Sequence, residues 1–390
     1  MAEHSPLGGS GVSRWVPCPG SVRLGYEVED DDDEFSGLGI AAHELAAHCL
    51  LWGGDAWEMI GFWNIAAGGP QVDKDMADAV QVYLDYVRHF HPDRNQGNWW
   101  IERAFKCSDI HEYFYGTADS VFYDAEERTL FVDDYKHGAG VVVDVKNNGQ
   151  LMYYACGALE DLQLWDNVDR VVLGIIQPRG FHFDGPIRRW SISVDDLLIW
   201  LEDELVPAMD TALWSTYTES GEHCRFCPVR GRACPQIMKD MEEIEQMLKL
   251  QEKDAARKLT VEETGRFLDL LEVAKIAGKQ ALKNGTGMSN AGHKVPGWKL
   301  AKARSNRIFK DGAEHAAREE FGEKYLTDPK LKSPAEMDKM PGGTDFTARW
   351  AFKPDKGTTL VRDSDSRMAV SKDTKSAFQA ATKKRKVVKK

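Results

Sequence analysis

Two aspartates and a lysine at the ends of neighbouring predicted strands have the residue types and spacing that hydrolytic chemistry needs. Asp119 lies in one run of alternating apolar residues, and Asp134 and Lys136 end the next run. In an antiparallel hairpin of this spacing, both aspartates can lie on one face and share Mg²⁺ or Mn²⁺. Residues two apart on a strand point to the same face, so Lys136 can orient or deprotonate a water that attacks phosphorus. A surface ion pair would also explain so short a pattern.

Three further polar residues favour the chemical interpretation over the ion pair. Gln150 and Tyr154 are four residues apart, and therefore on one face of the helix predicted directly after the strands. There they could contact the backbone of a nucleic acid. His43 lies in a predicted early helix and is a candidate metal ligand, although a histidine by itself is more often an ordinary residue.

Three of the seven cysteines crowd into eleven residues: Cys224, Cys227 and Cys234. This spacing predicts a metal site, with zinc as the first interpretation, but a closed site needs a fourth thiolate. Cys18 is the best distant candidate. The remaining three are expected to pack as small apolar side chains: Cys49, Cys107 and Cys156.

The elements that must position these residues follow from the periodicity of the sequence. Apolar residues at helical spacing alternate with runs typical of strands, and the order predicts an α/β core rather than a regular βαβ repeat. The expected helices are 38–52, 73–90, 148–164 and 195–213, and the expected strands are 99–102, 116–123, 129–136 and 170–178.

The composition changes at about residue 240, where charged helical segments begin. A Thr260-x-x-Glu263 capping box predicts the start of another helix. We therefore expect a core domain over 1–240, a mainly helical extension with a small mixed region over 241–370, and a basic disordered tail over 371–390. The extension is expected to bind DNA or a partner.

The overall composition is that of an ordinary globular protein, with 42% hydrophobic and 29% charged residues. No apolar run approaches the roughly 20 residues of a membrane span, and the N-terminus does not resemble a secretory signal. These features predict a cytoplasmic protein without a membrane partner. The net charge of -12 argues against broad adhesion to nucleic acid, but it does not exclude a DNA enzyme.

The polar residues, taken in order, resemble the motif series of the RecB-like branch of the PD-(D/E)XK nucleases. The matching segments are His43, 116–119, 134–136 and Gln150-x-x-x-Tyr154. The resemblance implies a PD-(D/E)XK nuclease core, a mixed central sheet flanked by helices. It also implies that His43, Asp119 and Asp134 ligate the metal with the carbonyl of Tyr135, and that Lys136 acts in catalysis. Glu102 is similar to an acidic residue on the first core strand of these enzymes and is expected to have a secondary role.

The cysteines resemble those of the iron–sulfur subset of these nucleases, which includes the AddB and CRISPR-adaptation exonuclease types. The resemblance implies a [4Fe–4S] cluster ligated by Cys18, Cys224, Cys227 and Cys234, with zinc as the alternative. Such a cluster would act as a structural staple between segments about 200 residues apart. The whole chain also looks like a family of phage and prophage proteins in which a RecB-like nuclease carries such an extension.

These resemblances imply a metal-dependent exonuclease, rather than an endonuclease, that degrades DNA ends with a single strand in its channel. It would serve phage recombination or replication in the bacterial host cytoplasm, with a single-strand annealing protein as a further partner. One alternative is a DNA-binding or scaffold protein with a non-catalytic nuclease fold, which the complete set of polar residues disfavours. A zinc-dependent regulatory protein is another, but it leaves the series from His43 to Tyr154 unexplained.

Overall fold

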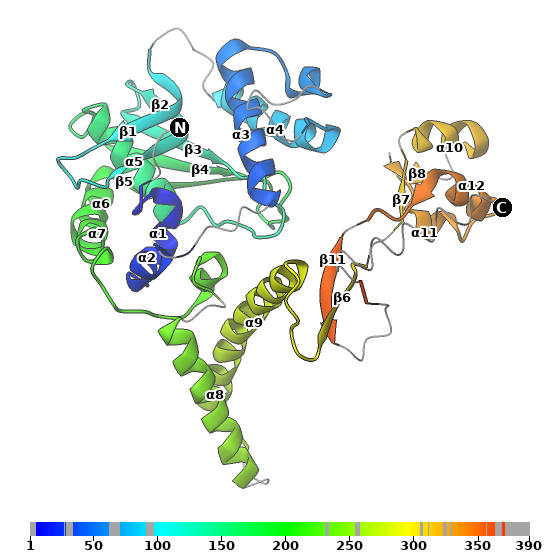
Figure 1. The fold of residues 1–390 in the computed structure, drawn as a ribbon. Coiled ribbons are helices and arrows are strands. Elements are labelled where there is room, and N and C mark those ends of the chain that lie inside the picture. The colour runs from blue at the N-terminus through cyan, green and yellow to red at the C-terminus, as the bar shows by residue number, and fades with distance from the viewer. Residues whose placement is uncertain are drawn as a thin grey trace. The chain divides into compact units, whose positions relative to one another are not determined.

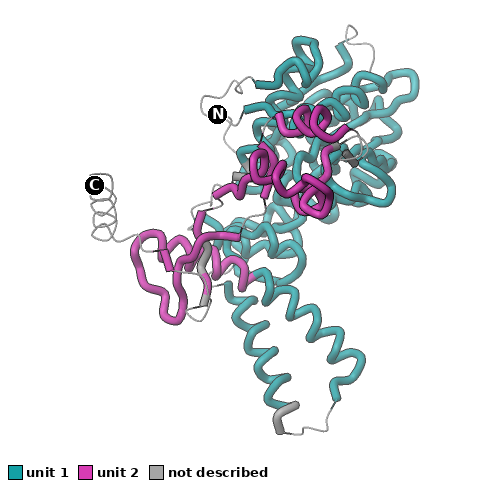
Figure 2. Tube along the Cα trace, turned by 90° about the vertical axis from the view of Figure 1, so that its right-hand side faces the viewer, with its two compact units in different colours: residues 1–276 teal, residues 277–390 magenta. Residues whose placement is uncertain are grey.

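The chain forms two compact units, residues 1–276 and 277–390, shown in separate colours in Figure 2. The computed structural model describes residues 5–26, 28, 34–61, 71–90, 97–230, 234–253, 258–304, 307–310, 312–322, 326–327, 330–355, 357–362 and 369–370. The basic tail predicted over 371–390 lies outside the described residues. No helix within these ranges is long and apolar enough to cross a membrane.

The first unit is built on one mixed sheet of five strands in the order β1-β2-β3-β4-β5 (Figure 1). The strands are β1 (Trp99–Lys106), β2 (Tyr115–Asp124), β3 (Thr129–Tyr135), β4 (Arg170–Ile176) and β5 (Ile187–Ser193). Only β3 and β4 pair in parallel; the other neighbours are antiparallel. The α/β class with a mixed central sheet and flanking helices is confirmed, although the sequence did not predict β5.

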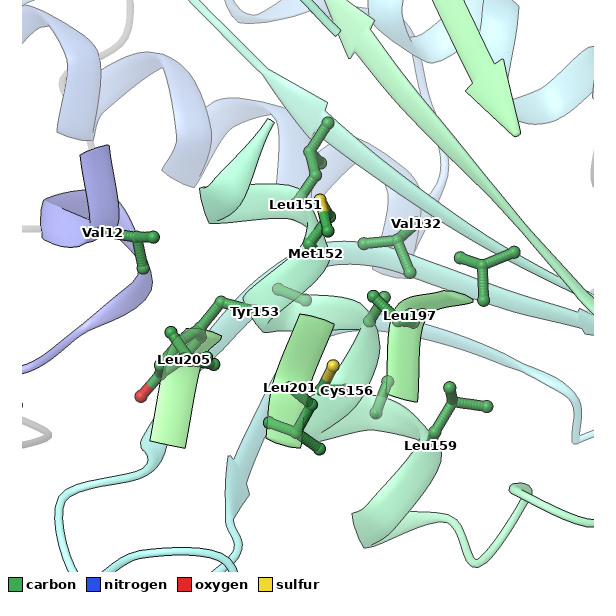
Figure 3. Packing of buried hydrophobic residues seen from close by; sticks show 14 of the residues in the cluster. Val12, Val132, Leu151, Met152, Tyr153, Cys156, Leu159, Leu197, Leu201 and Leu205 are labelled. Carbon is green, nitrogen blue, oxygen red and sulfur yellow. The ribbon is translucent and has the colours of Figure 1, made fainter. Parts of the chain in front are cut away.

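One face of the sheet is covered by α5 (Gly149–Asp161), which follows the hairpin β2–β3 along the chain. The side chain of Asn148 caps this helix by accepting a hydrogen bond from the amide of Leu151 (3.1 Å). The apolar core on this face also includes residues of α1 (Val12–Trp15), α6 (Val194–Trp200) and α7 (Val206–Ala212), as Figure 3 shows around Val132 and Leu151. Burying one such leucine stabilises the fold by roughly 1.5–3 kcal/mol.

The opposite face is covered by α3 (Glu34–Trp52) and α4 (Lys74–Phe90) (Figure 1). Side chains alternate along β3, so Tyr135 packs among the residues of α3 and α4 while Val132 lies in the α5 core. Asp133 shares the face of Tyr135 and accepts a hydrogen bond from Tyr86 (2.9 Å). Adjacent residues of a strand point to opposite faces, and Asp133 accordingly points away from the side of Asp134.

The helices that follow the sheet differ in detail from the predicted ones. The segment 195–213 is not one regular helix, because a π-helical turn (Leu201–Leu205) separates α6 from α7. The chain continues into α8 (Pro235–Lys253) and α9 (Val261–Asn290). The capping box is confirmed: the amide of Thr260 donates to Glu263 (3.0 Å), and the amide of Glu263 donates to the Thr260 hydroxyl (3.1 Å).

The remaining elements are short. In the first unit they are η1 (Gly9–Gly11), α2 (Gly20–Gly25), η2 (Ala56–Met59) and η4 (Glu222–Phe226). In the second unit they are β6 (Trp298–Lys302), β7 (Ile308–Phe309), α10 (Ala313–Phe321), β8 (Leu326–Thr327), β9 (Lys330–Leu331), α11 (Pro334–Met337), α12 (Gly343–Trp350), β10 (Ala351–Phe352) and β11 (Thr358–Arg362). Strands β6 and β11 pair, and a small separate core forms around Phe346.

Candidate metal and catalytic centre

Three residues from three different elements form a group that could hold a metal ion: His43 on α3, Glu102 on β1 and Asp119 on β2. One ligand atom from each lies within 4.8 Å of the others. His43 Nδ1 is 3.3 Å from Asp119 Oδ2, which also accepts a hydrogen bond from the amide of Tyr135 (2.8 Å). A site of carboxylate oxygens and one imidazole nitrogen suits Mg²⁺ or Mn²⁺ better than it suits a soft metal.

Glu102 has an unusual backbone for a strand residue, with a φ of +50°. Its neighbours remain in register, since Ile101 pairs with Ser120 and Arg103 with Ala118, so Glu102 lies across from Asp119. A left-handed conformation costs a non-glycine residue roughly 1–2 kcal/mol. Such strain concentrates at functional sites, and here it occurs where two carboxylates are brought together.

A second set of residues forms a continuous hydrogen-bonded chain beside the first. Lys136 Nζ donates to Gln150 Oε1 (2.9 Å) and to Asp134 Oδ1 (3.1 Å). Gln150 Nε2 lies 3.1 Å from both Asp134 Oδ1 and the hydroxyl of Tyr154. The spacing correctly predicted that residues 134 and 136 share one face of the strand. It also correctly predicted that residues 150 and 154 share one face of the helix.

Asp134 is 2% exposed, and its second oxygen is not satisfied. Oδ2 lies 2.9 Å from Lys136 Nζ but accepts no hydrogen bond of acceptable geometry from any residue in the described ranges. An unsatisfied buried acceptor is costly and needs an explanation. A cation or an ordered water at this oxygen would supply one.

The carboxylates of the centre are crowded enough to disturb one another. Burial, together with the charge of Asp119, raises the pKa of Asp134 to about 6 against the opposing effect of Lys136. Burial and Asp119 likewise raise the pKa of Glu102 to about 7. Burial alone would lower the pKa of His43, but the surrounding carboxylates outweigh it and raise the value to about 9. The centre thus holds more negative charge than its own cations neutralise, which favours a bound divalent cation.

The structure brings together every residue of the predicted centre, with two differences in arrangement. Asp134 lies outside the group of His43, Glu102 and Asp119, and it joins that group through the backbone of Tyr135. Glu102 belongs to the group itself, where the sequence indicated a secondary role. Tyr135 contributes its amide, and the metal-binding role of its carbonyl stays a prediction.

The four cysteines singled out by their spacing line one pocket: Cys18, Cys224, Cys227 and Cys234. All four are free thiols. The pocket also contains His223, which hydrogen-bonds to Cys18 and Cys224. Burial acts to raise the pKa of Cys18, but His223 and the amide of Glu219 outweigh it and lower the value. The spacing of the cysteines did not indicate His223, although its position next to Cys224 was a signal.

This donor set fits a metal that prefers sulfur. Four thiols converge in one pocket, and the donors at Cys18 favour its thiolate form, which is the form that ligates iron or zinc. Burial raises the pKa of Cys227 in the same pocket. The other cysteines lie in the apolar clusters, Cys49 on the α3–α4 side and Cys107 and Cys156 on the α5 side. Their predicted packing role is confirmed.

A comparison with protein families yields one match over nearly the whole chain. Residues 4–368 match a family whose description reads "Protein of unknown function (DUF2800)". The match includes both the carboxylate centre and the cysteine pocket.

Proposed function

We propose that this chain, which belongs to the DUF2800 family, is a metal-dependent DNA nuclease of the RecB-like PD-(D/E)XK type. The observation that carries the proposal is the hydrogen-bonded chain of Asp134, Lys136 and Gln150 beside the metal-binding group of His43, Glu102 and Asp119. A structural ion pair explains Lys136 and Asp134 alone. It does not explain the crowded carboxylates, the strained backbone of Glu102 or the unsatisfied oxygen of Asp134.

In this proposal His43, Glu102 and Asp119 hold Mg²⁺ or Mn²⁺, and Asp134 Oδ2 faces the same ion or its water. The cation would supply a more acidic water and neutralise charge on the phosphate. Lys136 is held by Asp134 and Gln150 so that its remaining N–H group can orient that water or contact a phosphate oxygen. The water oxygen would bond to phosphorus as the bond to the leaving oxygen breaks; the water would lose its proton to solvent, and the leaving oxygen would take one up from solvent.

Gln150 and Tyr154 have a positioning role. Gln150 uses its amide nitrogen on Asp134 and Tyr154 and its oxygen on Lys136, so it fixes the ammonium group relative to the carboxylate. The Tyr154 hydroxyl can still donate a hydrogen bond to the backbone of a bound strand.

The finer points of the proposal rest on the resemblance described above. The enzyme would act on DNA ends as an exonuclease, with one strand in the channel, in phage recombination or replication beside a single-strand annealing protein. Cys18, Cys224, Cys227 and Cys234 would hold a [4Fe–4S] cluster with a structural role, or zinc in its place. The alternative is a DNA-binding protein whose nuclease fold does not cut.

The test compares two neighbouring aspartates of β3. Wild type, Asp134→Asn and Asp133→Asn are incubated with end-labelled linear DNA and with circular single-stranded DNA, with and without Mn²⁺. We expect wild type and Asp133→Asn to shorten linear DNA only with Mn²⁺, and Asp134→Asn to lose at least about a thousand-fold in rate. Asp133 is the matched control because it is equally buried but lies on the opposite face. Equal DNA patterns with wild type and Asp134→Asn would contradict the proposal.

A further inference from the structure

The turn between β4 and β5 exposes two phenylalanine side chains to solvent. Phe181 is 89% exposed and Phe183 is 86% exposed. The ring of Phe183 stacks on that of His182, with centroids 4.4 Å apart and planes inclined by 22°. Large apolar side chains gathered on a surface commonly mark an interaction site.

The base of this turn is held firmly. Gln177 is 1% exposed, and its amide nitrogen donates to the carbonyls of Gly138 (2.9 Å) and Val141 (2.7 Å). Its oxygen accepts from the amide of Val143 (3.1 Å) and from Arg188 (3.0 Å). These bonds tie the turn to the loop that follows Lys136, so the phenylalanines are presented from a fixed base.

The turn lies next to the candidate centre. The amide of Lys136 donates to the carbonyl of Ile176 (2.9 Å), the residue that ends β4. Phe181 follows Ile176 by five residues, so their Cα atoms are at most about 18 Å apart. Arg179 is exposed, and one of its nitrogens lies 2.6 Å from a ring nitrogen of His137. Lys136 and the turn therefore follow the carboxyl ends of two paired parallel strands, β3 and β4, and lie at the same edge of the sheet.

We propose that Phe181 and Phe183, with Arg179, bind the unpaired bases of single-stranded DNA beside the centre. The inference rests on the proposed function, and it names the side chains that would hold the single strand next to the centre. Unpaired bases stack on aromatic rings irrespective of sequence, and an adjacent arginine attracts the backbone. The faces of bases within a duplex are already stacked and are not available to such rings.

The test measures binding without cleavage. The full-length protein in EDTA is titrated into a fluorescent oligothymidine and into a strand of equal length with abasic positions. We expect the double variant Phe181→Ala/Phe183→Ala to bind oligothymidine at least about ten-fold more weakly, and the abasic strand as wild type does. The variant Phe181→Trp/Phe183→Trp should restore the affinity, and Phe181→Leu/Phe183→Leu should not, because only the former keeps a stacking surface.

Two further variants separate this inference from its alternatives. Trp214→Ala removes an aromatic side chain that is also highly exposed, at 81%, and should leave binding unchanged. Asp133→Asn, whose side chain lies on the opposite face of β3 from the centre, should bind oligothymidine as wild type does. Because the assay contains EDTA, binding can be established even if the nuclease activity is absent. Equal loss of affinity for oligothymidine and the abasic strand would overturn the inference. So would a change of oligomeric state in the alanine variant, because the phenylalanines would then form a protein interface.

Discussion

The carboxylate centre and the cysteine pocket are assembled from the chain in opposite ways. The centre uses residues 43–154, and the side chains of Asp134, Lys136 and Gln150 are already hydrogen-bonded to one another. The pocket joins Cys18 to cysteines about 200 residues later, and its four thiols form no disulfide. The centre is thus prearranged by the protein, whereas the pocket gathers four free thiols that a metal would link in the proposed function.

This difference predicts which property each region controls. Changes in the centre should alter metal affinity and cleavage with little effect on stability, because the sheet and its two helical layers hold the backbone there. Changes in the pocket should alter the stability of the whole first unit, because a metal there restrains segments distant in sequence.

The largest expected effect is the loss of stability on replacing a cysteine of the pocket. We expect Cys224→Ser to lose the bound metal and to destabilise the protein by more than about 4 kcal/mol. The measurements are metal content, visible absorption of anaerobically purified protein, and thermal unfolding. Visible charge-transfer absorption would indicate iron–sulfur, and a colourless protein with one equivalent of zinc would indicate the alternative. Cys49→Ala, a buried cysteine outside the pocket, is the control and should keep the metal.

The next effect is on the centre and should leave stability nearly unchanged. Replacing His43 by alanine removes one member of the metal-binding group, so we expect affinity for Mn²⁺ to fall at least about ten-fold. Calorimetric titration of Mn²⁺ into the metal-free protein measures this change. His48→Ala, five residues further along the same helix, should bind Mn²⁺ as wild type does. Equal affinities for the two variants would remove His43 from the site.

A third substitution tests whether the N-terminal segment that leads to Cys18 also supports the position of Tyr154 in the centre. Gly9 lies in the N-terminal segment that leads to Cys18, and a Cβ there would meet Tyr154 at 2.6 Å and Tyr153 at 2.9 Å. We expect Gly9→Ala to destabilise the protein by about 1–3 kcal/mol and to slow cleavage, since Tyr154 must shift. Thermal unfolding and the DNA assay measure the two effects. Gly39→Ala, whose added carbon would meet nothing within 4 Å, should leave cleavage unchanged and stabilise α3 by roughly 0.5–1 kcal/mol.

The smallest expected effect is a gain in stability rather than a loss. Burial and Asp119 raise the pKa of Glu102 to about 7, so the ionised carboxylate destabilises the folded metal-free protein at pH 8. We expect Glu102→Gln to stabilise the metal-free protein by a few tenths of a kcal/mol at pH 8, and this gain should shrink as the pH falls towards 5. The same variant should gain less stability from Mn²⁺. Thermal unfolding with EDTA and with Mn²⁺ decides both points, and an unchanged response to Mn²⁺ would argue against Glu102 as a ligand.

The sequence predicted those parts of the fold in which one periodicity dominates. The strand expected over 129–136 is observed as Thr129–Tyr135, and the helix expected over 148–164 as Gly149–Asp161. Alternation along β3 and the four-residue spacing on α5 were enough to bring Asp134, Lys136 and Gln150 together.

The parts that were not predicted depend on tertiary contacts. In β5 the first inward residue is Arg188, which is 5% exposed and donates to Gln177 and to the carbonyl of Val143. The apolar alternation of this strand is therefore limited to Trp190 and Ile192, which is too short to indicate a strand by itself. Glu102 reaches the metal-binding group from a left-handed backbone that no propensity favours at a glutamate. His223 hydrogen-bonds to Cys18, a contact between segments about 200 residues apart that the local sequence does not indicate.

The long separation between Cys18 and its partners also sets an order of events during synthesis. A ribosome that adds 5–20 residues per second reaches Cys224 roughly 10–40 s after Cys18. Residues 43–154 are complete within that interval, while three of the four sulfur atoms do not yet exist. The nascent chain therefore holds the residues of its polar centre before it can acquire a metal in the pocket. In the proposed function, the metal of the pocket would therefore bind only after residues 43–154 have been synthesised.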